Sequence, residues 1–174
     1  MLPISLLPCN FIRRNHRTAF LRLLRSYMTD PMGGVTPHSR ECELEVVEAL
    51  WNHPTAYIQF AILDDKIVGM AVCFLNYSTF CAAPFVNVHD LTVLPAYRGL
   101  GVAKALLHGV TLYAMQRGCA KVTLEVREEN IVARALYARM GFQSSTPSME
   151  YLTLDLVSQR SLSPQTDQSS VDGD

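Results

Sequence analysis

The feature that most constrains the fold is a β-rich stretch that runs directly into a helix whose first turn contains glycines. The segment PFVNVHDLTVL (84–94) ends at Pro95, and AYRGLGVAKALL (96–107) then begins with turn-forming residues and ends in a helical pattern. The apolar positions of this helix share one face: Val102, Ala103, Leu106, Leu107, Val110 and Ala114. The sequence therefore predicts a strand, a tight turn and a well-anchored helix over 84–117.

The start of this helix has the chemistry of an anion site. The first N–H groups of a helix lack intrahelical acceptors and lie at the positive end of the helix dipole. Gly99 and Gly101 remove side chains that would keep a phosphate away from these groups. The P-loop pattern is absent, and a dinucleotide fingerprint beginning at Gly99 would need a small residue where Lys104 stands. The alternative is that both glycines only shape the turn.

The remaining segments predict a mixed sheet with helices on its faces. Strands are expected at 4–7, 56–63, 67–78, 121–126 and 149–156, and helices at 13–28, 40–51 and 130–140, with Ser39 as an N-cap. After Leu156 the chain has no aromatic residue and little to bury. One domain is therefore expected over 1–157, with a disordered tail over 158–174.

Composition narrows the functional class. A formal net charge of −1 gives no reason to expect a nucleic-acid or membrane partner. The five cysteines are odd in number and scattered, which favours reduced thiols over disulfides. The N-terminal apolar run precedes its basic residues, unlike a secretory signal, and no stretch reaches the roughly 20 apolar residues of a membrane span. A cytoplasmic protein is expected, and His16, His38, His53 and His108 show no metal-ligand spacing.

Two motifs, in order, resemble those of the GNAT superfamily of N-acetyltransferases. Arg98-x-x-Gly101-x-Ala103 resembles the family's pyrophosphate-binding pattern [Q/R]-x-x-G-x-[G/A], and ENIVARALYARMGF (129–142) resembles its N-x-x-A-x-x-x-Y-x-x-x-G-F signature. The resemblance runs from about Ala56 to Leu156. It implies an α/β (α+β) fold with a mixed, mostly antiparallel central sheet, flanked by helices on both faces and splayed at the central parallel strands. It also implies an enzyme that transfers acetyl directly from acetyl-CoA to a primary amine, without a metal.

The resemblance assigns most of the cofactor site to backbone groups. Amides from Arg98 to Lys104 would bind the diphosphate, and the side chains of Arg98 and Lys104 would add positive charge. Backbone groups of Leu91 to Val93 would pair with the pantetheine arm, and the Val93 amide would stabilise the oxyanion. The implied cofactor-binding set is Leu91, Thr92, Val93, Arg98, Gly99, Leu100, Gly101, Val102, Ala103, Lys104, Asn130, Ala133 and Tyr137.

The resemblance also suggests the acid and the base. Tyr137 would protonate the departing sulfur, although a core role for this tyrosine is the alternative. His89 lies where some polyamine-acetylating relatives carry Glu, and Asp90 lies beside it. Because adjacent strand residues point to opposite faces, only one of the two is expected to reach the substrate. His89 is preferred because imidazole titrates near neutrality. Asp90, water, or structural roles for both remain open.

The acceptor is expected to be a small-molecule amine. In relatives the N-terminal helices help to build the acceptor pocket, and here they carry Asp30, Glu41, Glu43, Glu45 and Glu48. Such a cluster suits a polyamine or diamine, although a simply solvated face is the alternative. The stretch 74–93 faintly resembles diamine-acetylating relatives. A protein or peptide N-acetyltransferase and a non-catalytic acetyl-CoA sensor are the other hypotheses. A homodimer, which relatives commonly form through their sheets, is left open.

Overall fold

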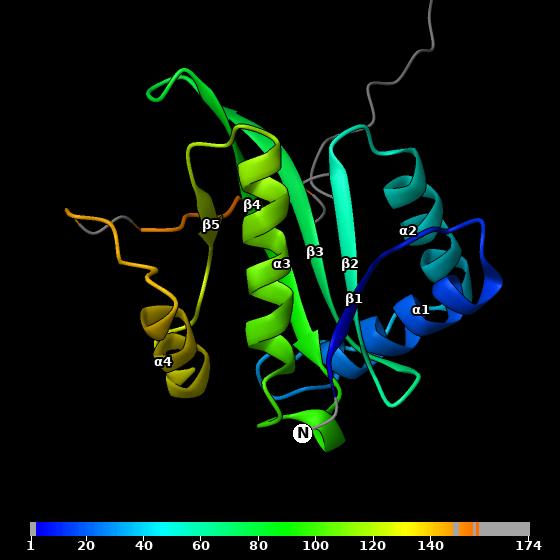
Figure 1. Cartoon of the computed structure of the whole chain (residues 1–174). Helices are drawn as coiled ribbons and strands as arrows, with labels where there is room; N and C mark the ends of the chain where they lie inside the picture. The colour runs from blue at the N-terminus through cyan, green and yellow to red at the C-terminus, as the bar shows by residue number, and fades with distance from the viewer. Residues whose placement is uncertain (1–2, 148–149, 155, 157–174) are drawn as a thin grey trace, which may run out of the picture. The chain divides into compact units, whose positions relative to one another are not determined.

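The computed structural model describes residues 3–147, 150–154 and 156, and the chain divides into two units, Met1–Gly141 and Phe142–Asp174. The first unit contains the strands and the longer helices (Figure 1). Their bounds are β1 Ser5–Pro8, α1 Arg14–Met28, α2 Arg40–Asn52, β2 Ala56–Leu63, β3 Lys66–Ser78, β4 Ala83–Val93, η1 Pro95–Tyr97, α3 Val102–Gln116, β5 Val122–Leu124 and α4 Ile131–Arg139.

The strands form one mixed sheet in the order β1-β2-β3-β4-β5. Neighbouring strands are antiparallel except for β4 and β5, which are parallel. The β4–β5 pairing covers Val86–Val88 against Val122–Leu124, whereas β4 continues to Val93. The two parallel strands therefore separate before β4 ends, which is the splay that the family resemblance implied.

Helices cover both faces of the sheet. On one face α3 packs so closely that a Cβ on Gly69 of β3 would lie 3.0 Å from Val102 Cγ1. The other face carries a buried cluster in which Phe20 and Leu23 of α1 and Val47 of α2 meet residues of β2 and β3. This layering, visible in Figure 1, confirms the predicted fold class.

Two helix starts form as local side-chain chemistry predicts. The Ser39 hydroxyl accepts a hydrogen bond from the Cys42 amide (3.3 Å) at the start of α2. The Asn130 side chain accepts one from the Ala133 amide (3.1 Å) at the start of α4. Both satisfy amides that lack an intrahelical acceptor.

The second unit, Phe142–Asp174, differs from the sequence prediction. Residues 150–154 form no strand, so the strand expected over 149–156 is wrong for them; residues 149 and 155 lie outside the described residues. Tyr151, Leu152 and Leu154 are exposed, so the apolar residues that suggested a strand have no buried face there. The tail over 158–174 also lies outside the described residues, and the single domain over 1–157 stays a prediction.

Candidate functional site

The turn between β4 and α3 depends on two glycines in the left-handed region. Gly99 has φ +76° and Gly101 has φ +86°. A Cβ on Gly99 would meet nothing within 4 Å, and one on Gly101 would reach only Ile4 Cδ1 at 4.0 Å. Conformation rather than space therefore requires glycine at both positions. Gly101 is the N-cap of α3, and its carbonyl accepts from the Ala105 amide (3.0 Å).

This turn leaves a run of unpaired amides at the start of α3. Within the described part of the chain, none of the amides from Gly99 to Lys104 has an acceptor in good hydrogen-bonding geometry. The Arg98 amide, in contrast, donates to the Pro95 carbonyl (3.3 Å). The available set therefore begins one residue later than the sequence suggested. Consecutive free amides at the positive end of a 15-residue helix suit a diphosphate.

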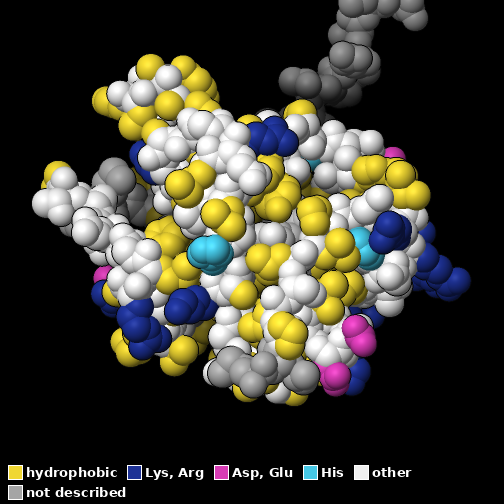
Figure 2. Space-filling model, viewed as in Figure 1, with side chains coloured by type: hydrophobic (Ala, Val, Ile, Leu, Met, Phe, Trp, Pro, Cys, Tyr) yellow, Lys and Arg dark blue, Asp and Glu magenta, His cyan; other side chains and the backbone are white. Residues whose placement is uncertain are grey.

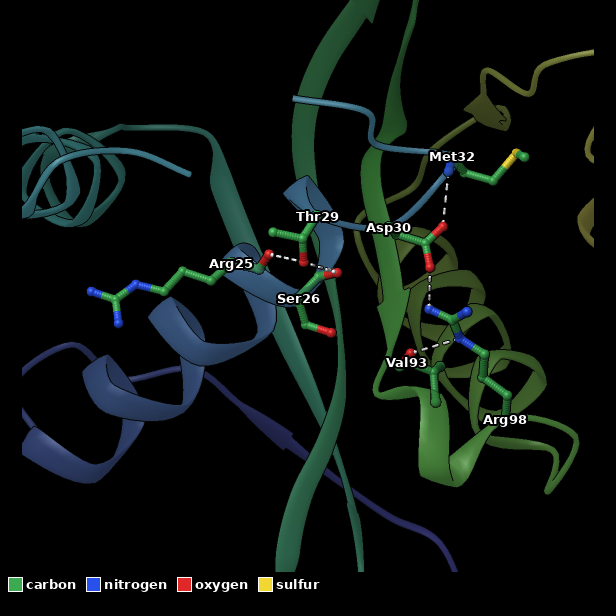
Figure 3. Close-up of polar contacts among 7 residues, drawn as sticks. All are labelled: Arg25, Ser26, Thr29, Asp30, Met32, Val93 and Arg98. Atoms are coloured by element: carbon green, nitrogen blue, oxygen red, sulfur yellow. Dashed lines mark hydrogen bonds and ion pairs between the residues drawn. The ribbon is translucent and has the colours of Figure 1, made fainter. Parts of the chain in front are cut away.

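The side chain of Arg98 is directed at protein acceptors. Its Nε donates to the Val93 carbonyl (3.1 Å), and its Nη2 donates to Asp30 Oδ2 (2.7 Å), as Figure 3 shows. Asp30 therefore already neutralises the guanidinium that was expected to add positive charge for the diphosphate. Lys104 is exposed in the first turn of α3.

Basic side chains also gather over α4, on the face that Figure 2 shows. This helix carries the exposed residues Arg134 and Arg139. A chain with a net charge of −1 thus has local positive charge in the helix that contains Tyr137.

The end of β4 offers backbone groups on its open side. The Leu94 amide donates to the Val68 carbonyl of the β3 side (2.9 Å). Because hydrogen-bonded and non-hydrogen-bonded pairs alternate, the pairs Gly69–Val93 and Ala71–Leu91 are non-hydrogen-bonded. The N–H groups of Leu91 and Val93 therefore point away from β3, towards the side on which β5 has already separated. Thr92 pairs with Met70, so its backbone groups are used within the sheet.

A β-bulge places His89 and Asp90 on the same face. The register passes from Cys73–Val88 to Val72–Asp90, so His89 is the extra residue of β4. Asp90 lies opposite Val72, a member of the buried cluster under α1 and α2. The His89 ring contacts Phe74, which packs on that same cluster, with ring centroids 5.7 Å apart. The expectation that the two side chains point to opposite faces is therefore wrong, because a bulge interrupts the alternation.

The carboxyl of Asp90 lies in a partly buried environment. Burial raises the pKa of Asp90, and the charge of the neighbouring His89 counteracts this in part. His89 itself is exposed. Burial also raises the pKa of Tyr27, and the negative charge of Asp90 adds to that rise. The last turn of α1 therefore lies within electrostatic reach of the bulge.

Tyr137 completes this group of residues from α4. Burial raises its pKa, and the nearby Tyr27 adds to the rise. Ala133, one turn earlier, is half-buried, and Asn130 uses its side-chain oxygen as the helix cap. Sequence reasoning did not assign Tyr27 to the site because its spacing matched the apolar positions of α1. The signal that could have assigned Tyr27 to the site was its polar phenol in the last turn of that helix.

The chain is similar in sequence and in fold to known proteins. Residues 19–142 match the model of the Acetyltransferase (GNAT) family. The chain belongs to this family. A curated relative, the thialysine N-epsilon-acetyltransferase of Mus musculus, is 32% identical over 87 residues, which are 50% of this chain and 51% of the relative. The chain thus matches about half the length of that GNAT relative.

Solved structures agree on the GNAT fold. A structure described as a transcriptional regulator from Bacillus halodurans C-125 has a TM-score of 0.74 at 16% identity, covering 88% of this chain and 100% of its own. An aminoglycoside N-acetyltransferase in complex with CoA has a TM-score of 0.70 at 20% identity, covering 88% of this chain and 96% of its own.

The acidic residues of the N-terminal helices of this GNAT domain and of the loop between them, where Asp30 lies, divide into two groups. Glu43 is buried and pairs with Arg25 through both carboxylate oxygens, and Asp30 pairs with Arg98. The remaining carboxylates of α2 are exposed: Glu41, Glu45 and Glu48. Two of the residues expected near an amine acceptor are therefore engaged in internal ion pairs.

A pocket of about 500 Å³ lies away from the predicted site residues. It is bordered by β1, the start of α1 and the end of α2, and contains none of them. Its buried His16 is held by the Asn10 amide, which donates to Nδ1 (3.0 Å). Within the described residues, no group of three or more His, Cys, Asp or Glu side chains could hold a metal ion, and no helix is both long and apolar enough to span a membrane.

Proposed function

We propose that this GNAT protein transfers an acetyl group from acetyl-CoA to the primary amine of a small molecule. The observation that carries this proposal is the run of unpaired amides from Gly99 to Lys104 beside the open edge of β4. Family membership and the name of the thialysine-acetylating relative support it.

Backbone groups would hold the acetyl donor. The amides from Gly99 to Lys104 would bind the diphosphate, with Lys104 adding charge. The N–H groups of Leu91 and Val93 face the open side of β4, where that of Leu91 can donate to a carbonyl of the pantetheine arm. The Val93 amide would then stabilise the oxyanion that forms at the acetyl carbon. Ala133 and the side-chain N–H₂ of Asn130 would line the arm from α4.

The His89–Asp90 pair would accept the proton of the acceptor ammonium. A primary ammonium with a pKa of about 10.4 is almost fully protonated at neutral pH, so a base must act on it. Both side chains lie on the α1–α2 face, and the raised pKa of Asp90 makes its carboxylate a stronger base than a surface carboxylate. The freed amine would attack the acetyl carbon.

Tyr137 would supply a proton to the leaving group. As the carbon–sulfur bond breaks, the sulfur takes the phenolic proton of Tyr137 and leaves as the thiol of CoA. The attacking nitrogen loses its second proton, which returns the tyrosinate to the phenol directly or through solvent, and the neutral acetylated amine departs. Because its pKa is raised above 10, this phenol is protonated at neutral pH. Burial therefore keeps Tyr137 in the protonated form that a general acid needs.

Calorimetric titration with acetyl-CoA, followed by a thiol-release screen, tests the proposal. The screen covers thialysine, polyamines, aminoglycosides, amino acids and short peptides. We expect micromolar binding and turnover on a small amine. Turnover on peptides alone indicates a protein N-acetyltransferase, and binding without turnover on any amine indicates a sensor. Absence of binding removes the proposal altogether.

The Tyr137→Phe variant tests the acid. We expect kcat to fall about 100-fold or more, within the range of general acid catalysis, while the Kd for acetyl-CoA stays unchanged. Tyr113→Phe is the matched control, because Tyr113 stacks on Tyr57 through its ring (3.7 Å between centroids) and phenylalanine keeps that ring. Equal kcat values for the two variants would exclude Tyr137 from the chemistry.

The variants His89→Gln and Asp90→Asn test the base. We expect both to lower kcat/KM and to move or flatten the acid limb of its pH profile. A profile that changes in only one variant would assign the base to that residue alone.

A further inference from the structure

The loop between α1 and α2 is organised around a single residue, Asp30. Its carbonyl accepts from the amides of Gly33 and Gly34 (2.8 Å each), and its Oδ1 accepts from the Met32 amide (2.9 Å). Its second carboxylate oxygen, Oδ2, accepts from Arg98 (2.7 Å). Asp30 therefore sets the conformation of this loop, and one of the four hydrogen bonds that it accepts comes from 68 residues further along the chain.

Arg98 joins this loop to the end of β4. Its Nε binds the Val93 carbonyl and its Nη2 binds Asp30, so one planar guanidinium spans two segments (Figure 3). Val93 is the residue whose amide faces the open edge of the sheet, and Arg98 directly precedes the first free amide at Gly99. One side chain thus contacts both the proposed oxyanion donor and the loop that follows α1.

The electrostatics of the pair match this geometry. The Met32 amide and then the Arg98 guanidinium hold the pKa of Asp30 below its usual value. The Asp30 side chain is only 12% exposed, whereas that of Arg98 is 49% exposed. The carboxylate is therefore the anchored partner, and the arginine reaches back to it.

We propose that Arg98 is a positioning residue that fixes Val93 and the α1–α2 loop relative to each other, and that its side chain is not a phosphate ligand. What the two segments bind rests on the proposed function: Val93 serves the acetyl donor, and the α1–α2 loop borders the acceptor. Breaking the link then impairs acceptor use and catalysis but leaves donor affinity intact.

Four variants separate positioning from phosphate binding: Arg98→Gln, Asp30→Asn, the double variant, and Lys104→Gln. We expect the first two to lower kcat/KM for the amine about 10- to 100-fold, the range of one charge-assisted hydrogen bond, with less than a twofold change in the Kd for CoA. The double variant should be no worse than either single one, because both remove the same link. Lys104→Gln should show the reverse pattern: a higher Kd for CoA, with little change in kcat/KM for the amine.

Amide hydrogen exchange supplies a readout that needs no substrate. Both single variants should accelerate exchange at Gly33 and Gly34, whose amides bind the Asp30 carbonyl. Asp65→Asn, which removes a carboxylate from the β2–β3 turn, is the matched control and should leave this exchange unchanged. Arg98→Lys keeps the positive charge but loses the planar guanidinium, whose Nε and Nη2 donate to two different acceptors. It should therefore resemble Arg98→Gln.

Two results would overturn the inference. One is a tenfold loss of CoA affinity in Arg98→Gln with unchanged exchange at Gly33 and Gly34. The other is full recovery of kcat/KM by Arg98→Lys. If the parent protein neither binds nor uses acetyl-CoA, the proposed function fails, but the exchange data still decide whether Arg98 organises the loop.

Discussion

Replacing Gly101 with alanine tests whether the turn before α3 serves the cofactor or only the fold. Gly101 has φ +86°, and an added Cβ would meet only Ile4 Cδ1 at an ordinary contact distance of 4.0 Å. The cost of the change is therefore conformational and not steric. An L-residue in the left-handed region costs about 1–2 kcal/mol. For a chain of this size, that cost lowers Tm by about 2–8 °C.

The same substitution should weaken cofactor binding for a separate reason. Val102, Ala103 and Lys104 present free amides only while Gly101 holds its left-handed conformation. Loss of one hydrogen bond to a charged phosphate weakens binding about 10- to 100-fold. Calorimetric titration with CoA measures the loss of affinity, and thermal unfolding of the free protein measures the loss of stability.

Gly118 provides the matched control at the other end of α3. It has φ +66°, and an added Cβ would meet nothing within 4 Å, so Gly118→Ala should lose similar stability. It lies beyond the last turn of the helix, away from the free amides, so its Kd for CoA should stay at the parent value. Equal losses of CoA affinity in the two variants would refute the assignment of the diphosphate to this turn.

Two further predictions concern buried charge. Burial raises the pKa of Asp90 above 3.8, so ionisation of this carboxyl opposes folding at neutral pH. Asp90→Asn should therefore raise Tm at pH 7. The gain should vanish as the pH falls below the pKa of Asp90 in the unfolded chain. A lower Tm at pH 7 would contradict this. Arg25→Gln should lower Tm more than Glu43→Gln, because it leaves a buried carboxylate unpaired whereas the reverse change leaves an arginine at the surface. Arg25 holds the pKa of Glu43 below 4.5 in the folded protein. The stabilisation by the Arg25–Glu43 pair is therefore complete above pH 4.5, and it is lost as the pH falls through the lower pKa that Glu43 has in the folded protein. Thermal unfolding at several pH values checks it, and equal losses of Tm in the two variants would contradict the predicted difference between them.

Local chemistry made much of the site predictable. The glycines at 99 and 101 specify the turn, because only glycine adopts positive φ without cost. Ser39 and Asn130 cap their helices through bonds that span three residues. The hairpin β2–β3 forms close to where the pattern of apolar residues placed it.

Contacts between distant segments could not be read in the same way. Arg98 was expected to face a phosphate, but its acceptors are the Val93 carbonyl and Asp30. His89 and Asp90 were expected on opposite faces, but the register with β3 makes His89 the extra residue of a bulge. Tyr27 looked like one more apolar position of α1 until packing brought it near Asp90 and Tyr137.

The sequence by itself determined the order of the elements up to α4, the turn that exposes the amides and the caps of α2 and α4, because each depends on residues a few positions apart. The tertiary structure decided which backbone groups of β4 stay free, which carboxylates are already paired and that Tyr27 lies near Asp90 and Tyr137. Those outcomes depend on strand register and helix packing, in which residues tens of positions apart compete for the same partners.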